Sequence, residues 1–506
     1  MMSDESSSQG ETRRLGDRAA RGGLHTGLGQ ISRVFLQMAS VVVLARLLDA
    51  RDYGLIAMVL AIVGVGEIFR ELGLSGAVIQ AHTLSRAQRD NLFWISAGAG
   101  LVMAVAVAAA SPLIAGIYGE PSLIAITIAL APTFFISGLS SPYRAQLTRG
   151  MRFGTIAIAD VVSGTLALGA GVLFALGGAG YWALVAQQLL SGLISLIVML
   201  IASRWVARMY DRATSVKSFL RLGGAVLATQ VMTYVSSNID AVLIGARYGP
   251  TELGYFNRGL QLIRTPTNIL RGPVGNVTLP VIAKLQHEPV LVVRFVERAQ
   301  VLASLPILIM LGWFIACADA VVRLALGDQW LPATVIMQLI AMVEGLSTLT
   351  VVVASLLIGL GQVRGLVTLS VVTLVLKVTF LLFALPFGVE AVVFASVVLQ
   401  LLGIPLAIYY ARAVTSLPLG RLMVQSLRIL AVTGLATFGA WWVMNAWVPP
   451  LAAILEILAS GGVLAALLSL GLLFPHVRSD YFVVLSTAQR ALKRKAKKSQ
   501  KVDDVE

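Results

Sequence analysis

Apolar residues fall in long, nearly continuous runs from about residue 24 to residue 474, separated by short polar or turn-forming stretches. Most runs hold about twenty or more residues, the length at which an α-helix crosses a hydrocarbon core of about 30 Å. The alternation of apolar and polar residues that is typical of membrane β-barrels does not occur. The pattern predicts an all-α polytopic membrane protein with fourteen spans, near 24–48, 54–79, 92–117, 122–143, 153–177, 180–203, 219–246, 253–281, 297–318, 331–360, 365–386, 389–411, 424–447 and 451–474.

The predicted spans are separated by residues that favour turns. Glycine adopts positive φ angles without strain, and proline cannot continue a helix from its interior. These residue types mark five of the breaks: Tyr118–Pro121, Gly177–Gly180, Tyr248–Pro250, Gly361–Gln362 and Pro449–Pro450.

Lysine and arginine are unevenly divided between the two sides of this map. Of 39 such residues, 29 lie in the two tails and in alternate loops with their adjoining span ends, four lie in the opposite loops and six lie inside spans. Cytoplasmic loops of membrane proteins are enriched in basic residues, so both termini are predicted to be cytoplasmic. The four residues on the opposite side are Arg46, Arg51, Arg247 and Arg323.

Composition narrows the functional classes. The chain has 506 residues, of which 57% are hydrophobic and 13% are charged, whereas about a quarter are charged in soluble proteins. The single cysteine, Cys317, cannot form an intrachain disulfide, and four scattered histidines do not suggest a metal centre. No Walker A, HExxH or GxSxG motif is present, so we predict a transporter without a cofactor rather than an enzyme. The net charge of +14 is explained by topology and by the basic run Lys493–Lys498, which should lie against anionic membrane lipids rather than bind nucleic acid.

An internal repeat divides the chain. Val43–Arg46 and Asp52–Gly54 resemble Leu243–Arg247 and Glu252–Gly254, about 200 residues later and again between two spans. Such a parallel repeat is a common plan for transporters with a central site. We therefore predict two six-helix lobes and two extra helices, with these boundaries: cytoplasmic tail 1–23, N-lobe 24–212, C-lobe 213–412, helices thirteen and fourteen 413–475, and basic cytoplasmic tail 476–506.

Four stretches carry a family resemblance. Ala45–Gly54, Glu71–Gln80, Tyr143–Arg149 and the segment from Asn238 to Asn257 are similar to the corresponding parts of Wzx-type polysaccharide flippases. This family belongs to the multidrug/oligosaccharidyl-lipid/polysaccharide (MOP) exporter superfamily. The similarity covers roughly residues 25–290, and the rest agrees in topology. One departure is Glu71, where many relatives have aspartate, but the carboxylate is retained.

The resemblance implies a function and partners. Such proteins move undecaprenyl-pyrophosphate-linked oligosaccharides from the inner to the outer leaflet of the bacterial cytoplasmic membrane, by alternating access, for lipopolysaccharide and other cell-envelope polysaccharides. The expected partners are this lipid-linked oligosaccharide, membrane lipids, and the glycosyltransferases and polymerase of the same pathway. Coupling to H⁺ or Na⁺ is expected in place of a cofactor. Alternatives within the superfamily are a lipid II flippase and a multidrug/cation antiporter.

The eighth span carries the main candidate site. Its polar residues are spaced by three and four, so they form one stripe on an otherwise apolar helix. Charges inside a membrane cost about 2.5–3.5 kcal/mol on insertion scales and need a partner or a wet cavity. We expect the stripe to line a cavity, because two arginines on one face have few acidic partners, although arginines that simply join helices are the alternative. The stripe consists of Asn257, Gln261, Arg264, Asn268 and Arg271.

The first two spans add polar residues at a similar depth. Arg33 and Gln37 share one face of the first helix, and antiparallel packing would bring Arg33 level with Glu67, Arg70 and Glu71. Guanidinium groups offer paired donors to phosphate, and amides suit sugar hydroxyls. We therefore predict that Arg33 and Gln37 bind substrate together with the stripe, and that the three residues of the second span act in ion pairing or coupling.

Other charged residues inside the spans are predicted to pair. Asp240 and Arg258 lie at similar depth on consecutive helices, as do Glu344 and Lys377. Asp160, near the cytoplasmic end of the fifth span, fits a coupling carboxylate and an interfacial charge equally well.

Overall fold

The computed structural model describes the chain except residues 1–28, 30–31, 67–84, 213–216, 448–451 and 504–506. The chain divides into two compact units, Met1–Asn257 and Arg258–Glu506. Among the described residues all regular structure is helical, and ten helices are long and apolar enough to cross a membrane. The predicted all-α polytopic class is therefore confirmed, whereas the exact count of fourteen spans stays a prediction.

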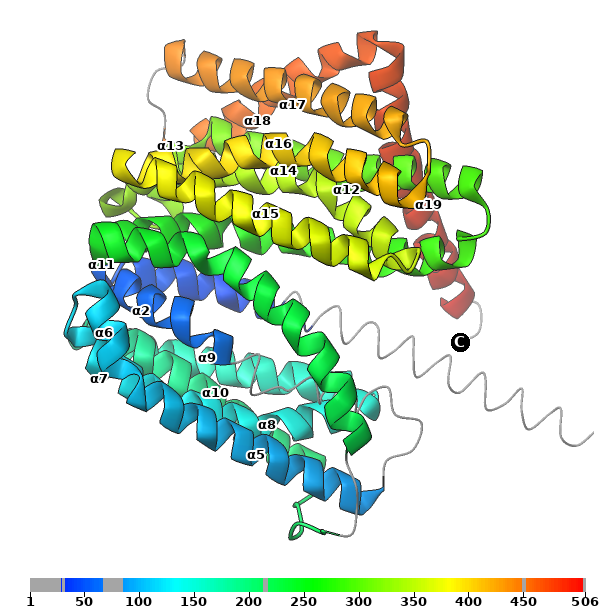
Figure 1. The fold of residues 1–506 in the computed structure, drawn as a ribbon. Coiled ribbons are helices and arrows are strands. Elements are labelled where there is room, and N and C mark those ends of the chain that lie inside the picture. Colours follow the sequence, from blue (N-terminus) through cyan, green and yellow to red (C-terminus); the bar gives the residue numbers. More distant parts are fainter. Residues whose placement is uncertain (1–28, 30–31, 67–84, 213–216, 448–451, 504–506) are drawn as a thin grey trace, which may run out of the picture. The chain divides into compact units, whose positions relative to one another are not determined.

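The first unit is built from helical hairpins. Helices α5 and α8 pack against each other, as do α9 and α10, and α8 also contacts α10 (Figure 1). Gly100 and Gly138 meet at the α5–α8 crossing, where small residues let two backbones approach. The helices of this unit are Ser32–Ala45, α2 (Ala50–Val63), α5 (Arg86–Ala109), α6 (Ser111–Tyr118), α7 (Ser122–Leu130), α8 (Pro132–Arg149), α9 (Phe153–Leu176), α10 (Trp182–Ser203) and the part of α11 (Lys217–Leu285) up to Asn257.

The second unit has a denser core. Helices α12, α14 and α16 share buried apolar residues such as Val296, Leu356 and Ile404, and α17 and α18 pack against α12 (Figure 1). Besides the rest of α11, this unit contains α12 (Pro289–Ala316), α13 (Ala318–Ala325), η1 (Asp328–Trp330), α14 (Ala333–Gly359), α15 (Val363–Ala384), η2 (Leu385–Phe387), α16 (Val389–Thr415), α17 (Gly420–Ala446), α18 (Ala453–Leu470), η3 (Gly471–Leu473) and α19 (Pro475–Asp503).

The predicted breaks fall at glycines with positive φ. Gly119, Gly178 and Gly361 have φ angles of 66°, 75° and 72° and follow the ends of α6, α9 and α14. Gly249, with φ 84° and ψ −175°, interrupts α11 where the boundary between the seventh and eighth spans was predicted. The predicted break at Pro449–Pro450 lies outside the described residues.

The two copies of the repeat meet within the first unit. A Cβ atom built on Gly54 would lie 1.6 Å from the Pro250 carbonyl oxygen, and one built on Gly254 would lie 1.9 Å from the Ala50 carbonyl oxygen. The contact is therefore reciprocal between residues that are 200 positions apart. Glycine is required at both places because the opposing atoms belong to the backbone and cannot rotate away.

Candidate functional site

The second half of α11 runs parallel to α14. Near one end Gly259 lies against Met337, and near the other Ile282 lies against Gly359, so residue numbers rise together along both helices. Parallel neighbours must cross the membrane in the same direction, as predicted for the eighth and tenth spans. This packing brings the polar stripe of α11 to the glutamate in the middle of α14.

Both arginines of the stripe bind one carboxylate. Arg264 Nε lies 2.7 Å from Glu344 Oε1, and Arg271 Nη1 lies 3.0 Å from Glu344 Oε2. The Glu344 side chain is only 8% exposed. Two guanidinium groups and one carboxylate leave this cluster with one net positive charge.

The two arginines differ in how completely they are held. Arg271 Nη2 also donates to the Glu344 backbone oxygen, at 2.6 Å, and to Ser347 Oγ, at 2.5 Å, and its side chain is 23% exposed. Arg264 donates only through Nε, its side chain is 37% exposed, and neither of its terminal nitrogens has a hydrogen-bond partner among the described residues. Arg271 thus joins two helices, whereas Arg264 presents an open pair of donors.

This geometry corrects one expectation from the sequence. The two arginines were expected to have few acidic partners, but Glu344 serves both, because α11 packs beside α14 rather than only beside its neighbours in sequence. The predicted pairing of Glu344 with Lys377 stays a prediction. So does the pairing of Asp240 with Arg258, since these two residues belong to different compact units.

The remaining stripe residues lie on the same helix face. Gln261 is half-buried and Asn268 is exposed, one turn on either side of Arg264. Asn257 is half-buried at the end of the first unit.

A second arginine–carboxylate cluster lies in the first unit. Arg144 on α8 binds Asp160 on α9 through two hydrogen bonds of 3.0 and 2.7 Å, and Arg33 Nη1 lies 3.9 Å from the same carboxylate. The Arg33 side chain is 59% exposed, and Gln37, one turn further on, is exposed as well. Asp160 is therefore held by arginines.

Arg144 was not assigned a role from the sequence. The available signal was its position, since Asp160 lies 16 residues later on the antiparallel neighbouring helix. The predicted partners of Arg33 on the second span, namely Glu67, Arg70 and Glu71, lie outside the described residues.

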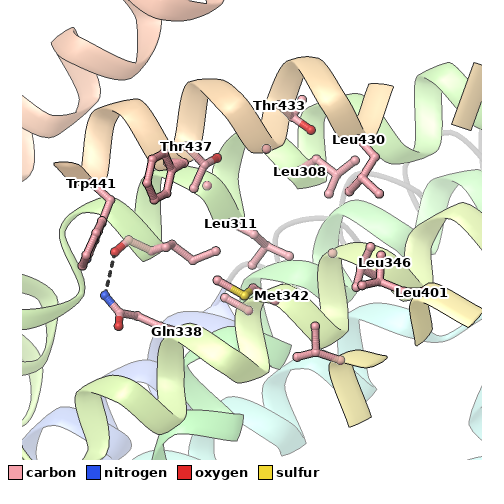
Figure 2. A pocket seen from close by; sticks show the side chains of 17 residues that line it. Leu308, Leu311, Gln338, Met342, Leu346, Leu401, Leu430, Thr433, Thr437 and Trp441 are labelled. Atoms are coloured by element: carbon pink, nitrogen blue, oxygen red, sulfur yellow. Dashed lines mark hydrogen bonds between the residues drawn. The ribbon is translucent and has the colours of Figure 1, made fainter. Parts of the chain in front are cut away.

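An apolar cavity of about 500 Å³ lies in the second unit between α12, α14, α16 and α17. Leu311, Met342 and Trp441 line it, and the amide of Gln338 is turned to the Ile315 backbone oxygen at 3.1 Å (Figure 2). Such walls suit hydrocarbon and offer little to a charged or sugar headgroup. Among the described residues no group of three or more histidine, cysteine, aspartate or glutamate side chains is arranged to hold a metal ion.

Solved structures define the class of this fold. The lipid II flippase MurJ in an inward closed conformation is similar over 90% of this chain and 99% of its own, with a TM-score of 0.70 at 12% identity. An inward-facing multidrug resistance MATE family transporter of the MOP superfamily covers 76% of this chain and 96% of its own, with a TM-score of 0.59 at 14% identity. The chain thus has the fold of MOP-superfamily membrane transporters.

Sequence comparison gives the family. The chain belongs to the polysaccharide biosynthesis protein family, whose match covers residues 43–335. It is 23% identical over 356 residues to the lipopolysaccharide biosynthesis protein WzxC of Escherichia coli, covering 69% of this chain and 71% of that protein. It is 25% identical over 301 residues to the teichuronic acid biosynthesis protein TuaB of Bacillus subtilis, covering 58% of this chain and 62% of that protein. The chain is therefore a member of a polysaccharide biosynthesis family that has the fold of a multi-pass membrane transporter.

Proposed function

We propose that this protein is a flippase that moves a polyprenyl-diphosphate-linked oligosaccharide, of the undecaprenyl type, from the inner to the outer leaflet of the bacterial cytoplasmic membrane. It would do so by alternating access, with both termini in the cytoplasm, and supply surface polysaccharide synthesis. The names of WzxC and TuaB, and of the succinoglycan biosynthesis transport protein ExoT of Rhizobium meliloti, support a saccharide pathway. Glycosyltransferases and a polymerase of that pathway are the proposed partners.

The observation that carries the proposal is the open donor pair of Arg264. A diphosphate brings negative charge and several acceptor oxygens, and a guanidinium matches two of them with two parallel donors. Gln261 and Asn268, one turn away on either side, offer amide donors and acceptors for sugar hydroxyls. A cationic drug would instead need acidic or aromatic partners, so the basic cluster argues against a multidrug/cation antiporter.

A lipid II flippase would use the same cationic site, so the substrate has to be identified directly. Cells lacking this protein should accumulate one lipid-linked oligosaccharide on the inner leaflet, and its glycan identifies the pathway. Accumulation of lipid II alone would replace our proposal with the lipid II alternative.

The role of Arg264 is tested by a graded series at matched protein levels. Arg264→Lys keeps the positive charge but loses the two parallel guanidinium donors, so it should retain partial transport. Arg264→Ala should lose most transport, and Arg264→Glu all of it. Full complementation by Arg264→Glu at normal expression would refute the cationic site.

We also propose that transport is coupled to H⁺ or Na⁺, and that Asp160 is an ion-pair residue and not the coupling group. Its two arginine neighbours support this assignment, because both guanidinium groups already form ion pairs with this carboxylate. If Asp160→Asn abolished the dependence of transport on an ion gradient, the assignment would be wrong.

A further inference from the structure

The carboxylate of Glu344 lies where an anionic headgroup would act. It occupies the Nε edge of Arg264 and one terminal nitrogen of Arg271, at 2.7 and 3.0 Å. It is also fixed in place, because Arg271 binds the Glu344 backbone oxygen and the Ser347 hydroxyl of the same helix turn. A substrate that reaches Arg264 therefore also meets the Glu344 carboxylate, which is part of the protein and stays in the site.

We infer that Glu344 is an internal competitor of the headgroup, which weakens diphosphate binding enough for the substrate to be released. This inference rests on the proposed function. With Glu344 ionised, the cluster attracts an anion with one net positive charge; without it, two positive charges would hold the same ligand. A transporter must release its substrate on the other side, so tighter binding would slow each cycle.

Charge arithmetic gives this inference a distinct signature. Coulomb energy is proportional to the ligand's charge, and a diphosphate diester carries twice the charge of a monophosphate diester. Charges about 6 Å apart in an effective dielectric of about 40 change affinity about tenfold per ligand charge. Glu344→Gln should therefore increase the affinity for a monophosphate lipid about tenfold and the affinity for a diphosphate lipid about a hundredfold. A purely structural glutamate would not produce this charge-dependent ratio.

The probes are two synthetic polyprenyl lipids with the same chain and the same sugar, one joined through a diphosphate and one through a monophosphate. Their affinities for the full-length protein in nanodiscs can be compared by native mass spectrometry, and transport of the diphosphate lipid can be timed in vesicles. We expect Glu344→Gln to bind both lipids more tightly, in the stated ratio, and to transport more slowly.

A matched control is available in the same unit. Asp480 binds Arg428 through two hydrogen bonds, and its side chain is 9% exposed, nearly as buried as Glu344. Asp480→Asn removes a comparable charge from a pair between α17 and α19, and we expect the ratio of the two affinities to stay at the wild-type value.

A second variant decides the case if Glu344→Gln does not fold. Ser347→Asp adds a carboxylate that Arg271 can bind, so no buried arginine loses a partner. It should lower the affinity for both lipids, by about tenfold per negative charge on the lipid. If either folded variant at 344 or 347 binds both lipids as the wild type does, the inference is wrong. Should Arg264→Glu also bind the diphosphate lipid normally, the proposed function itself fails.

Discussion

Replacing Arg271 by alanine should destabilise the second compact unit, whereas the same replacement at Arg264 should leave it folded. Arg271 contributes an ion pair with Glu344 and hydrogen bonds to the Glu344 backbone and to Ser347. Its removal leaves the carboxylate, only 8% exposed, with half of its partners. Arg264 contributes one hydrogen bond through Nε and keeps its other donors open.

The expected magnitudes follow from burial. Breaking a buried, hydrogen-bonded ion pair by removing one partner costs about 3–5 kcal/mol, and Arg271→Ala should approach this range. The Arg264 side chain is 37% exposed, so solvent screens its pair, and Arg264→Ala should cost about 1 kcal/mol. The difference of a few kcal/mol is a large fraction of the unfolding free energy of most domains.

Thermal unfolding of the purified variants in the same detergent measures this difference, and complementation at matched protein levels measures transport. We expect Arg271→Ala to unfold at a clearly lower temperature, and Arg264→Ala to unfold close to the wild type but to transport poorly. Equal destabilisation by the two changes would show that Arg264 also serves mainly to join helices, and would refute the reasoning.

Three further predictions concern other parts of the chain. Gly54→Ala should destabilise the protein by at least about 2 kcal/mol, because its methyl group meets a backbone carbonyl, whereas Gly98→Ala has open space and should not destabilise it. A cysteine at position 208, in a Cys317→Ser background, should resist impermeant thiol reagents in intact cells, and labelling from outside would overturn the predicted topology. Burial raises the pKa of Asp52, so the folded protein binds a proton at this carboxyl more tightly than the unfolded chain does. The stability that this proton contributes is lost as the pH rises through the raised pKa. Asp52→Asn should therefore melt at a higher temperature than the wild type at pH 7 but not at pH 4.

The helices were predictable because hydrocarbon leaves the backbone few choices. Every buried peptide group must be hydrogen-bonded within its own helix, so span length and turn residues set the boundaries. Gly249 shows this well, since a glycine before a proline ends one helix and begins the next in the middle of α11. The polar stripe was predictable for a similar reason, because a spacing of three and four fixes the face of a helix.

The partners of the charged residues were harder to predict. Depth along each helix can be estimated from the sequence, and Arg264, Glu344 and Lys377 all fall near the same level. Which helices are neighbours is a property of tertiary packing, and here α11 lies beside α14, with α12 and α13 intervening in sequence. Pairing only consecutive spans therefore missed the contact that holds Glu344.

The two clusters suggest what the repeat has kept. In the first unit Arg144 and Arg33 share Asp160, and in the second Arg264 and Arg271 share Glu344. The two clusters use different helices, yet each has two arginines for one carboxylate. A purely structural requirement is met by any neutral pair, whereas a surplus of positive charge in both units is what an anionic cargo requires.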